Sequence, residues 1–315
     1  MQPTLVSFPD GSLTGEAEVL VVDPASSVVV VDATPFHPVD HTWPDQPGDA
    51  GTLRVGDAVF EITEAVMAAI SDEGALAVGS EIPVKRGAEG WTWLVGHRLA
   101  PVPTDGADVA DGADVADGVD VTDDADVADG AVTVGALEVG AVAVLEVDAA
   151  RRVGLSRGHT ACHLASLALD LAVADLWRKD PGADALGNPD FEGRANQSSR
   201  IHADGSVDEY RLGKSLRKAG FDTDSFAASL GEREAQINAQ LTAWVASGAA
   251  SRVVVDGPSI VDRRRWECEL PEGTASIPCG GTHASSLAEF TSISVSLDLS
   301  DPQLLIMTTT AVPAA

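Results

Sequence analysis

The chain has 315 residues, of which 44% are hydrophobic, so it is long enough for about two domains with sizeable cores. Its formal net charge is −29, whereas proteins that bind nucleic acids normally carry a basic surface. Arginine is far more frequent than lysine, which suits a salty cytoplasm or a coding bias. We therefore interpret the acidity as adaptation rather than as evidence against an RNA partner.

No feature of the sequence predicts secretion or membrane insertion. Residues 1–14 lack the basic and apolar regions of a signal peptide, and no apolar run is as long as a membrane helix. Three cysteines are too few for a disulfide framework, which fits a reducing compartment. We therefore expect a cytoplasmic protein without membrane contact. The sequence leaves its oligomeric state open.

The first half of the chain is predicted to be a small β-domain covering residues 1–148. Its short Val-rich runs are separated by glycines and prolines, which is typical of a small barrel or sandwich. Residues 67–71 are interpreted as one helical turn or a loop. The predicted strands are residues 18–22, 28–32, 52–55, 59–62, 91–99 and 139–148.

An acidic low-complexity insertion interrupts this domain at residues 104–130. It consists of imperfect six-residue repeats that contain ten Asp and no basic residue. Such Asp-rich repeats can supply oxygen ligands for calcium, but their spacing fits neither an EF-hand nor a nine-residue calcium repeat. We therefore predict a solvated, disordered loop.

The second half, residues 149–315, is predicted to be an α+β domain. Helical spacing of apolar residues predicts helices over residues 158–177 and 225–246. The predicted strands are residues 252–256, 293–299 and 304–310. The simplest arrangement is a two-layer sandwich, with the helices on one side of a largely antiparallel sheet.

Two short segments of this half carry four potential metal ligands. His159 and His163 are four residues apart, so that on a helix they share one face and can hold the same ion. Cys279 and His283 have the same spacing, but the two glycines between them favour a bend. Three imidazoles and a thiolate form the ligand set of a tetrahedral zinc site.

The role of such an ion depends on how many of the four side chains bind it. Four protein ligands are typical of a closed structural site, whereas three leave a position for water or substrate. An open site activates water for attack on an ester, or it orients the substrate through an amino or hydroxyl group. The sequence does not choose between these roles.

The residues around both pairs resemble a known family. His-Thr-Ala-Cys-His-Leu at residues 159–164 and Ile-Pro-Cys-Gly-Gly-Thr-His at 277–283 are similar to the two metal motifs of the alanyl-tRNA synthetase editing domain and of its free-standing relatives, the AlaX proteins. The threonyl-tRNA synthetase editing domain shares both ligand pairs. A match upstream, Thr-Pro-Phe-His at 34–37 followed by Gln-Pro-Gly-Asp-Ala-Gly at 46–51, favours the alanyl branch. Here the family's tyrosine is replaced by His37, and its glycine run by residues 39–45.

The resemblance implies a zinc-dependent hydrolase that removes a wrong amino acid, typically serine, from alanine tRNA. Such editing is needed because binding alone discriminates poorly between amino acids of similar shape. The matching motif positions imply that Thr34 and Gln46 line the amino-acid pocket. The alternative is that Thr34 is an ordinary strand residue and Gln46 a turn residue.

Further polar residues are candidates for roles near this site. Cys162 stands where the family has threonine, and we interpret it as a small packed side chain rather than a further ligand. His37 and His41 belong to a surface loop or reach the pocket. An exposed charged run is usually only a solvated face, but the best candidates for contacts with tRNA phosphates are two arginine groups, namely Arg151, Arg152 and Arg157, and Arg263, Arg264 and Arg265.

The leading functional hypothesis is therefore trans-editing of mischarged tRNA, most specifically Ser-tRNA(Ala). The altered glycine segment and the acidic surface favour a second hypothesis, a metal-dependent hydrolase of a small ester or amino-acid derivative. A third hypothesis is a non-catalytic binding module that zinc stabilises.

Overall fold

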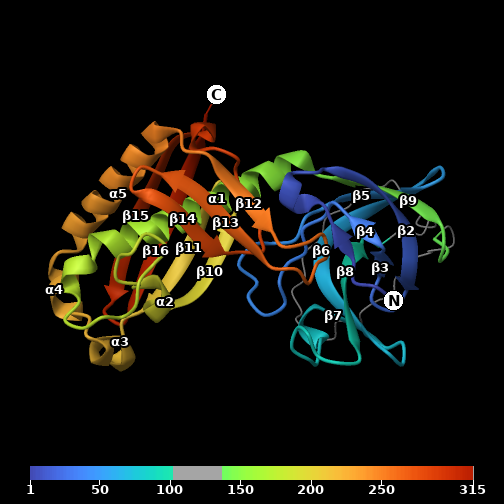
Figure 1. Cartoon of the computed structure of the whole chain (residues 1–315), viewed down its shortest axis with the longest axis horizontal. Helices are drawn as coiled ribbons and strands as arrows, with labels where there is room; N and C mark the ends of the chain where they lie inside the picture. Colours follow the sequence, from blue (N-terminus) through green and yellow to red (C-terminus); the bar gives the residue numbers. More distant parts are fainter. Residues whose placement is uncertain (102–136, 315) are drawn as a thin grey trace, which may run out of the picture.

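The computed structural model describes residues 1–101 and 137–314, and the acidic insertion lies outside them. The protein is a mixed α+β structure with a large antiparallel sheet. Strands dominate its N-terminal half, and helices and further strands form the C-terminal half (Figure 1). Among the described residues, no helix combines the length and apolar character needed to cross a membrane.

The N-terminal half contains a seven-stranded antiparallel sheet in the order β5-β9-β2-β3-β8-β6-β7. Strand β5 also pairs with β6. The strand pairings therefore form a closed ring, in the order β5, β9, β2, β3, β8, β6 and back to β5. The strands of this half are β1 (Leu5–Val6), β2 (Thr14–Asp23), β3 (Val28–Val31), β4 (Ala33–Thr34), β5 (Gly51–Val55), β6 (Ala58–Ser71), β7 (Leu76–Val78), β8 (Trp91–Leu99) and β9 (Val142–Val147).

The prediction of a helical turn or loop at residues 67–71 was wrong, because this segment is the end of the long strand β6. Its side chains alternate between two hydrophobic clusters. Ala65, Met67 and Ala69 pack in the larger core of this half, whereas Val66 and Ala68 pack in a smaller cluster on the other face. A strand that is buried on both faces has no polar alternation in its sequence, so the usual strand signal is missing.

The C-terminal half combines helices with two further antiparallel sheets, ordered β10-β11-β16-β15 and β12-β13-β14. Its helices are α1 (Ala149–Ala172), α2 (Glu192–Ala195), α3 (Lys214–Ala219), α4 (Thr223–Ala228) and α5 (Leu230–Ser247). Its strands are β10 (Asn196–His202), β11 (Gly205–Arg211), β12 (Ser251–Val255), β13 (Arg264–Leu270), β14 (Gly273–Pro278), β15 (Phe290–Asp301) and β16 (Leu304–Pro313).

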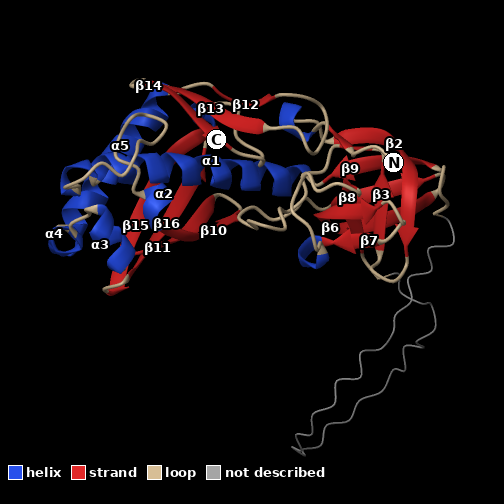
Figure 2. Ribbon diagram, turned by 60° about the horizontal axis from the view of Figure 1, so that its bottom comes forward, coloured by secondary structure: helices blue, strands red, loops and turns tan. Residues whose placement is uncertain are grey.

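Helix α1 runs from the N-terminal strands into the C-terminal half and contacts β10, β11, β16 and α5 (Figure 2). It begins nine residues earlier than predicted, with the Asp148 side chain accepting a hydrogen bond from the backbone N–H of Arg151. Gly154 and Gly158 hide this start, because glycine disfavours helices. A Cβ at Gly158 would overlap backbone oxygens of His202 and Gly205, so the glycine lets α1 approach the β10–β11 hairpin closely.

The predicted second helix, residues 225–246, is in fact two helices, α4 and α5, which meet at Ser229. Behind them lies the C-terminal core, whose buried members come from residues 161–311. The N-terminal core is formed by residues 8–147 and by Ile260, which reaches it from the loop between β12 and β13. This loop also bonds to the N-terminal segment, since the N–H of Ile260 donates to the carbonyl of Thr4.

Candidate metal centre

Four side chains meet where α1 passes the segment that follows β14. The ligand atoms of His159, His163, Cys279 and His283 all lie within 4.8 Å of one another. The Sγ of Cys279 is 3.5 Å from Nε2 of His159 and 3.3 Å from Nε2 of His283. The two sequence pairs, more than a hundred residues apart, therefore form one cluster, as their ligand chemistry predicts.

Local structure places each pair as its spacing indicates. His159 and His163 lie on successive turns of α1, with ring centroids 4.7 Å apart. Cys279 and His283 lie in an irregular segment, because β14 ends at Pro278. Gly281 is needed there, since a Cβ on it would overlap the ring of His159.

Gln46 holds the ring of His159 in one orientation. Its Oε1 accepts a hydrogen bond from the backbone N–H of Thr282 at 3.1 Å, which fixes which end of the amide is the oxygen. The same Oε1 lies 2.7 Å from Nδ1 of His159, so this nitrogen must donate. The lone pair of His159 is therefore on Nε2, which faces Cys279.

Thr160 holds the ring of His283 in one orientation. The Thr160 hydroxyl donates to the carbonyl oxygen of Ser156 and lies 3.2 Å from Nδ1 of His283. Because its hydrogen is already used, the hydroxyl accepts from Nδ1, and the Nε2 lone pair of His283 also faces the cluster. Such outer hydrogen bonds orient metal-binding histidines in general.

The chemistry of the cluster fits a metal ion. Nε2 of His163 is buried without any hydrogen-bond partner among the described residues, which is costly unless a ligand satisfies it. Burial lowers the pKa of His163 to about 4 and that of His159 and His283 well below its usual range, so the rings are neutral, as ligation requires. Burial also raises the pKa of Cys279 to about 12, whereas a bound cation would favour its thiolate.

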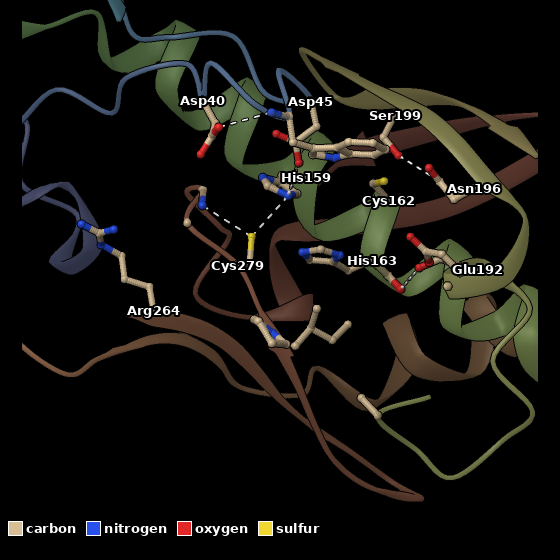
Figure 3. Close-up of a pocket in the computed structure, with 18 of the residues that line it drawn as sticks. Asp40, Asp45, His159, Cys162, His163, Glu192, Asn196, Ser199, Arg264 and Cys279 are labelled. Carbon is tan, nitrogen blue, oxygen red and sulfur yellow. Dashed lines mark hydrogen bonds and ion pairs between the residues drawn. The ribbon is translucent and has the colours of Figure 1, made fainter. Parts of the chain in front are cut away.

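The cluster forms part of the wall of a pocket with a volume of about 780 Å³. His159, His163 and Cys279 line this pocket between two chemically different ends (Figure 3). One end contains Arg264, and the other contains Glu192. An ion held by the cluster would therefore face a space large enough for a small molecule or the end of a larger one.

The second end is acidic. Its lining includes Asp170, Asp184, Asp190 and Glu192. Burial raises the pKa of Asp170 to about 9 and that of Glu192 to about 7. The acceptor oxygens of this end suit a protonated amino group.

Asp45 lies beside the cluster of histidine and cysteine side chains. Its Oδ2 is 3.7 Å from Nε2 of His159, and it is the one carboxylate in residues 1–101 and 137–314 within 4.0 Å of a ligand nitrogen. Burial raises the pKa of Asp45 to about 6. Asp45 was not predicted as a site residue, because it lies in the segment that departs from the family pattern, directly before Gln46.

The two predicted pocket residues lie behind the site rather than in the pocket lining. Gln46 is buried and binds His159, as described above. The Thr34 hydroxyl is 2.8 Å from Nε2 of His97 and accepts a hydrogen bond from the backbone N–H of Phe36. In this arrangement, Thr34 contributes to the packing of the N-terminal half, and its contact with an amino-acid substrate stays a prediction.

The six arginines that we considered for tRNA binding do not form one free basic surface. Arg152 is buried and pairs with Asp49, and Arg157 pairs with Asp204. The remaining arginines differ in environment: Arg151 binds the carbonyl of Gly48, Arg265 pairs with Asp256 and Glu267, Arg263 is exposed, and Arg264 is buried in the pocket wall. Their role in binding tRNA stays a prediction.

The remaining candidates near the site differ in burial. Cys162 is buried, as expected for a packed thiol, and Cys268 is buried as well. His41 is half-buried. His37 reaches the pocket rather than the surface, whereas the ring of His41 packs against Trp93.

A scan against protein-family models finds no match, and a search of curated proteins finds no significant match. The resemblance to the editing-domain family therefore rests on the short motifs around the cluster and on their order along the chain.

Proposed function

We propose that the protein is a metal-dependent hydrolase that deacylates mischarged tRNA, with Ser-tRNA(Ala) as its substrate. The observation that carries this proposal is the convergence of His159, His163, Cys279 and His283 in one cluster, three of whose members line a pocket, namely His159, His163 and Cys279. Zinc is the ion that these ligands prefer, and it supplies Lewis acidity toward an ester carbonyl.

The residues of the chain have distinct tasks in this proposal. Gln46 and Thr160 fix the rings of His159 and His283, so that their Nε2 atoms face the cluster. Asp45 lines the pocket beside His159, where its carboxylate can accept a hydrogen bond from an attacking water. The carboxylates near Glu192 can hold the free α-amino group of the esterified amino acid.

A second candidate is a hydrolase of a small ester or amino-acid derivative. It is favoured by the acidic pocket end and by the pairing of Arg152, Arg157 and Arg265 with acidic side chains. A small amino ester needs no basic surface, whereas a tRNA does.

The test is deacylation of Ser-tRNA(Ala) and Ala-tRNA(Ala) by the purified protein, at low and high salt. We expect the seryl ester to be hydrolysed and the alanyl ester to be spared. A chelator should stop the reaction and added zinc should restore it.

No hydrolysis of Ser-tRNA(Ala) at any salt concentration, with zinc bound, would contradict the proposal. Serine methyl ester then separates the remaining hypotheses. Its metal-dependent hydrolysis supports the small-substrate enzyme, and its stability supports a non-catalytic binding module.

A further inference from the structure

Among the described residues, Arg264 is a buried cation with no carboxylate in direct contact. Arg152 and Arg264 are the two buried arginines of the described chain, with 4% and 9% of their surface exposed. Arg152 pairs with Asp49, but no carboxylate in the described residues lies within 4.0 Å of the Arg264 guanidinium. A buried charge without a direct ion pair is unfavourable, so an anionic ligand at this position would offset part of the cost.

The hydrogen bonds of Arg264 use two of its five N–H donors and leave the Nε–H without a partner among the described residues. Its Nη2 donates to the carbonyl oxygen of Ser259 at 3.1 Å and its Nη1 to that of Ile260 at 3.4 Å. These bonds hold the guanidinium against the β12–β13 loop. The Nε–H is buried without a partner among the described residues, and the side chain lines the pocket.

His37 provides a second available nitrogen at the same end of the pocket. It is 6% exposed, and its Nδ1 has no partner among the described residues. Both residues pack against the ring of Phe8. The guanidinium carbon of Arg264 is 5.2 Å from the centroid of this ring, and the centroid of the His37 ring is 5.1 Å from it. Burial lowers the pKa of His37 to about 4, so at neutral pH its ring is uncharged and can donate one N–H.

We propose that Arg264 and His37 form an anion subsite that holds a phosphate or carboxylate group of the substrate beside the metal centre. Figure 3 shows Arg264 on the opposite side of Cys279 from Glu192, so the subsite and the acidic end flank the cluster. The pocket thus suits a substrate with an anion at one end and an amino group at the other.

This subsite adds a binding group to the proposed function. It rests on that function in one respect, namely that the substrate binds in this pocket. In an aminoacyl-tRNA the amino acid's carboxyl group is esterified, so the anion is a phosphate of the terminal nucleotides. In a small amino-acid derivative it is a free carboxylate. Both groups match the planar, charged donors of arginine.

The test is calorimetric titration of the zinc-loaded protein with adenosine 5′-monophosphate, with adenosine as the uncharged comparison. Arg264→Gln should weaken binding of the monophosphate by about tenfold to a hundredfold, as expected for lost hydrogen bonds between charged groups. It should leave adenosine binding unchanged. Arg252→Gln is the matched control, because it removes the same charge from an exposed position in the same sheet; the monophosphate should bind it as it binds the unchanged protein.

N-Acetylserine is the carboxylate probe. Arg264-dependent binding of N-acetylserine alone would support the subsite and assign it to a carboxylate. The subsite does not exist if neither anion binds the unchanged protein. It also does not exist if both anions bind the Arg264→Gln variant as tightly as they bind the unchanged protein. Zinc content must be unchanged in each variant, and binding is measured without turnover, so a failure of the deacylation test leaves these results valid.

A second variant covers the case in which Arg264→Gln does not fold. His37→Phe keeps a ring packed against Phe8 and removes the free nitrogen. We expect it to weaken binding of the anion that the unchanged protein binds by about tenfold, as for one lost hydrogen bond to a charged group. Unchanged affinity for that anion would overturn the subsite.

Discussion

At Gly281 the backbone passes close to the candidate metal ligand His159. An added Cβ would overlap the ring of His159 and lie 2.6 Å from Oε1 of Gln46. A Cβ at the preceding residue, Gly280, would meet nothing within 4 Å. The contact with His159 and Gln46 therefore requires glycine at residue 281 but not at residue 280.

We predict that Gly281→Ala displaces the hydrogen-bonded pair of His159 and Gln46 and weakens zinc binding by about tenfold to a hundredfold, the usual effect of disturbing outer partners of a ligand. Gly280→Ala should bind zinc as the unchanged protein does. Competition with a chromophoric chelator measures both affinities. Equal affinity in the two variants would show that the ring of His159 is not held as described.

The sequence predicts the four residues that form the cluster because their signal is local. Spacing of four residues places His159 and His163 on one helix face, and the glycines predict the bend that separates Cys279 from His283. The partners of these ligands were not predictable in the same way. Gln46 reaches His159 across 113 residues of sequence, and only the tertiary fold brings them together.

At the level of elements, Asp170 joins α1 to the start of α2. Its Oδ1 accepts hydrogen bonds from the backbone N–H groups of Phe191 and Glu192, both at 2.9 Å. Burial raises the pKa of this carboxyl to about 9. The folded protein therefore binds a proton at Asp170 more tightly than the unfolded chain does.

This shift has a defined effect on stability. Between pH 3.8, the ordinary pKa, and about pH 9, the folded value, Asp170 holds a proton in the folded state but not in the unfolded chain. Its contribution to the free energy of unfolding therefore falls as pH rises. Asp170→Asn keeps the acceptor oxygen and removes the titration. We predict that its stability relative to the unchanged protein increases from pH 5 to pH 9, measured by urea unfolding of the metal-loaded forms.

Asp175→Asn provides the control for this experiment. The hydrogen bond from Arg233 lowers the pKa of the exposed Asp175, so its contribution is complete above pH 4 and should not change between pH 5 and pH 9. A stability difference for Asp170→Asn that is equally independent of pH would contradict the raised pKa.

Strand β15 agrees with the sequence because its buried and exposed residues alternate as expected. Strand β8 has the predicted bounds, although most of its residues are buried. The end of β6 was misread because it packs on both faces, and the start of α1 because its glycines serve a tertiary contact. Both errors arise where packing overrides local preference.

At the scale of the whole molecule, the pocket lies between the two cores. Phe8 and Ile260 bring the N-terminal core to its wall, and Leu167 brings the C-terminal core. The buried ion pair of Arg152 and Asp49 ties the start of α1 to the loop that carries Gln46. The two halves are therefore both needed to build one site.

The central claim is that His159, His163, Cys279 and His283 bind one zinc ion. The most direct measurement is the zinc content of the purified protein and of two cysteine variants. We predict one zinc per chain in the unchanged protein and in Cys268→Ala, whose thiol is buried in the core away from the cluster. We predict a large loss of zinc in Cys279→Ala. Full zinc occupancy in Cys279→Ala, or none in the unchanged protein after zinc is supplied, would contradict the account.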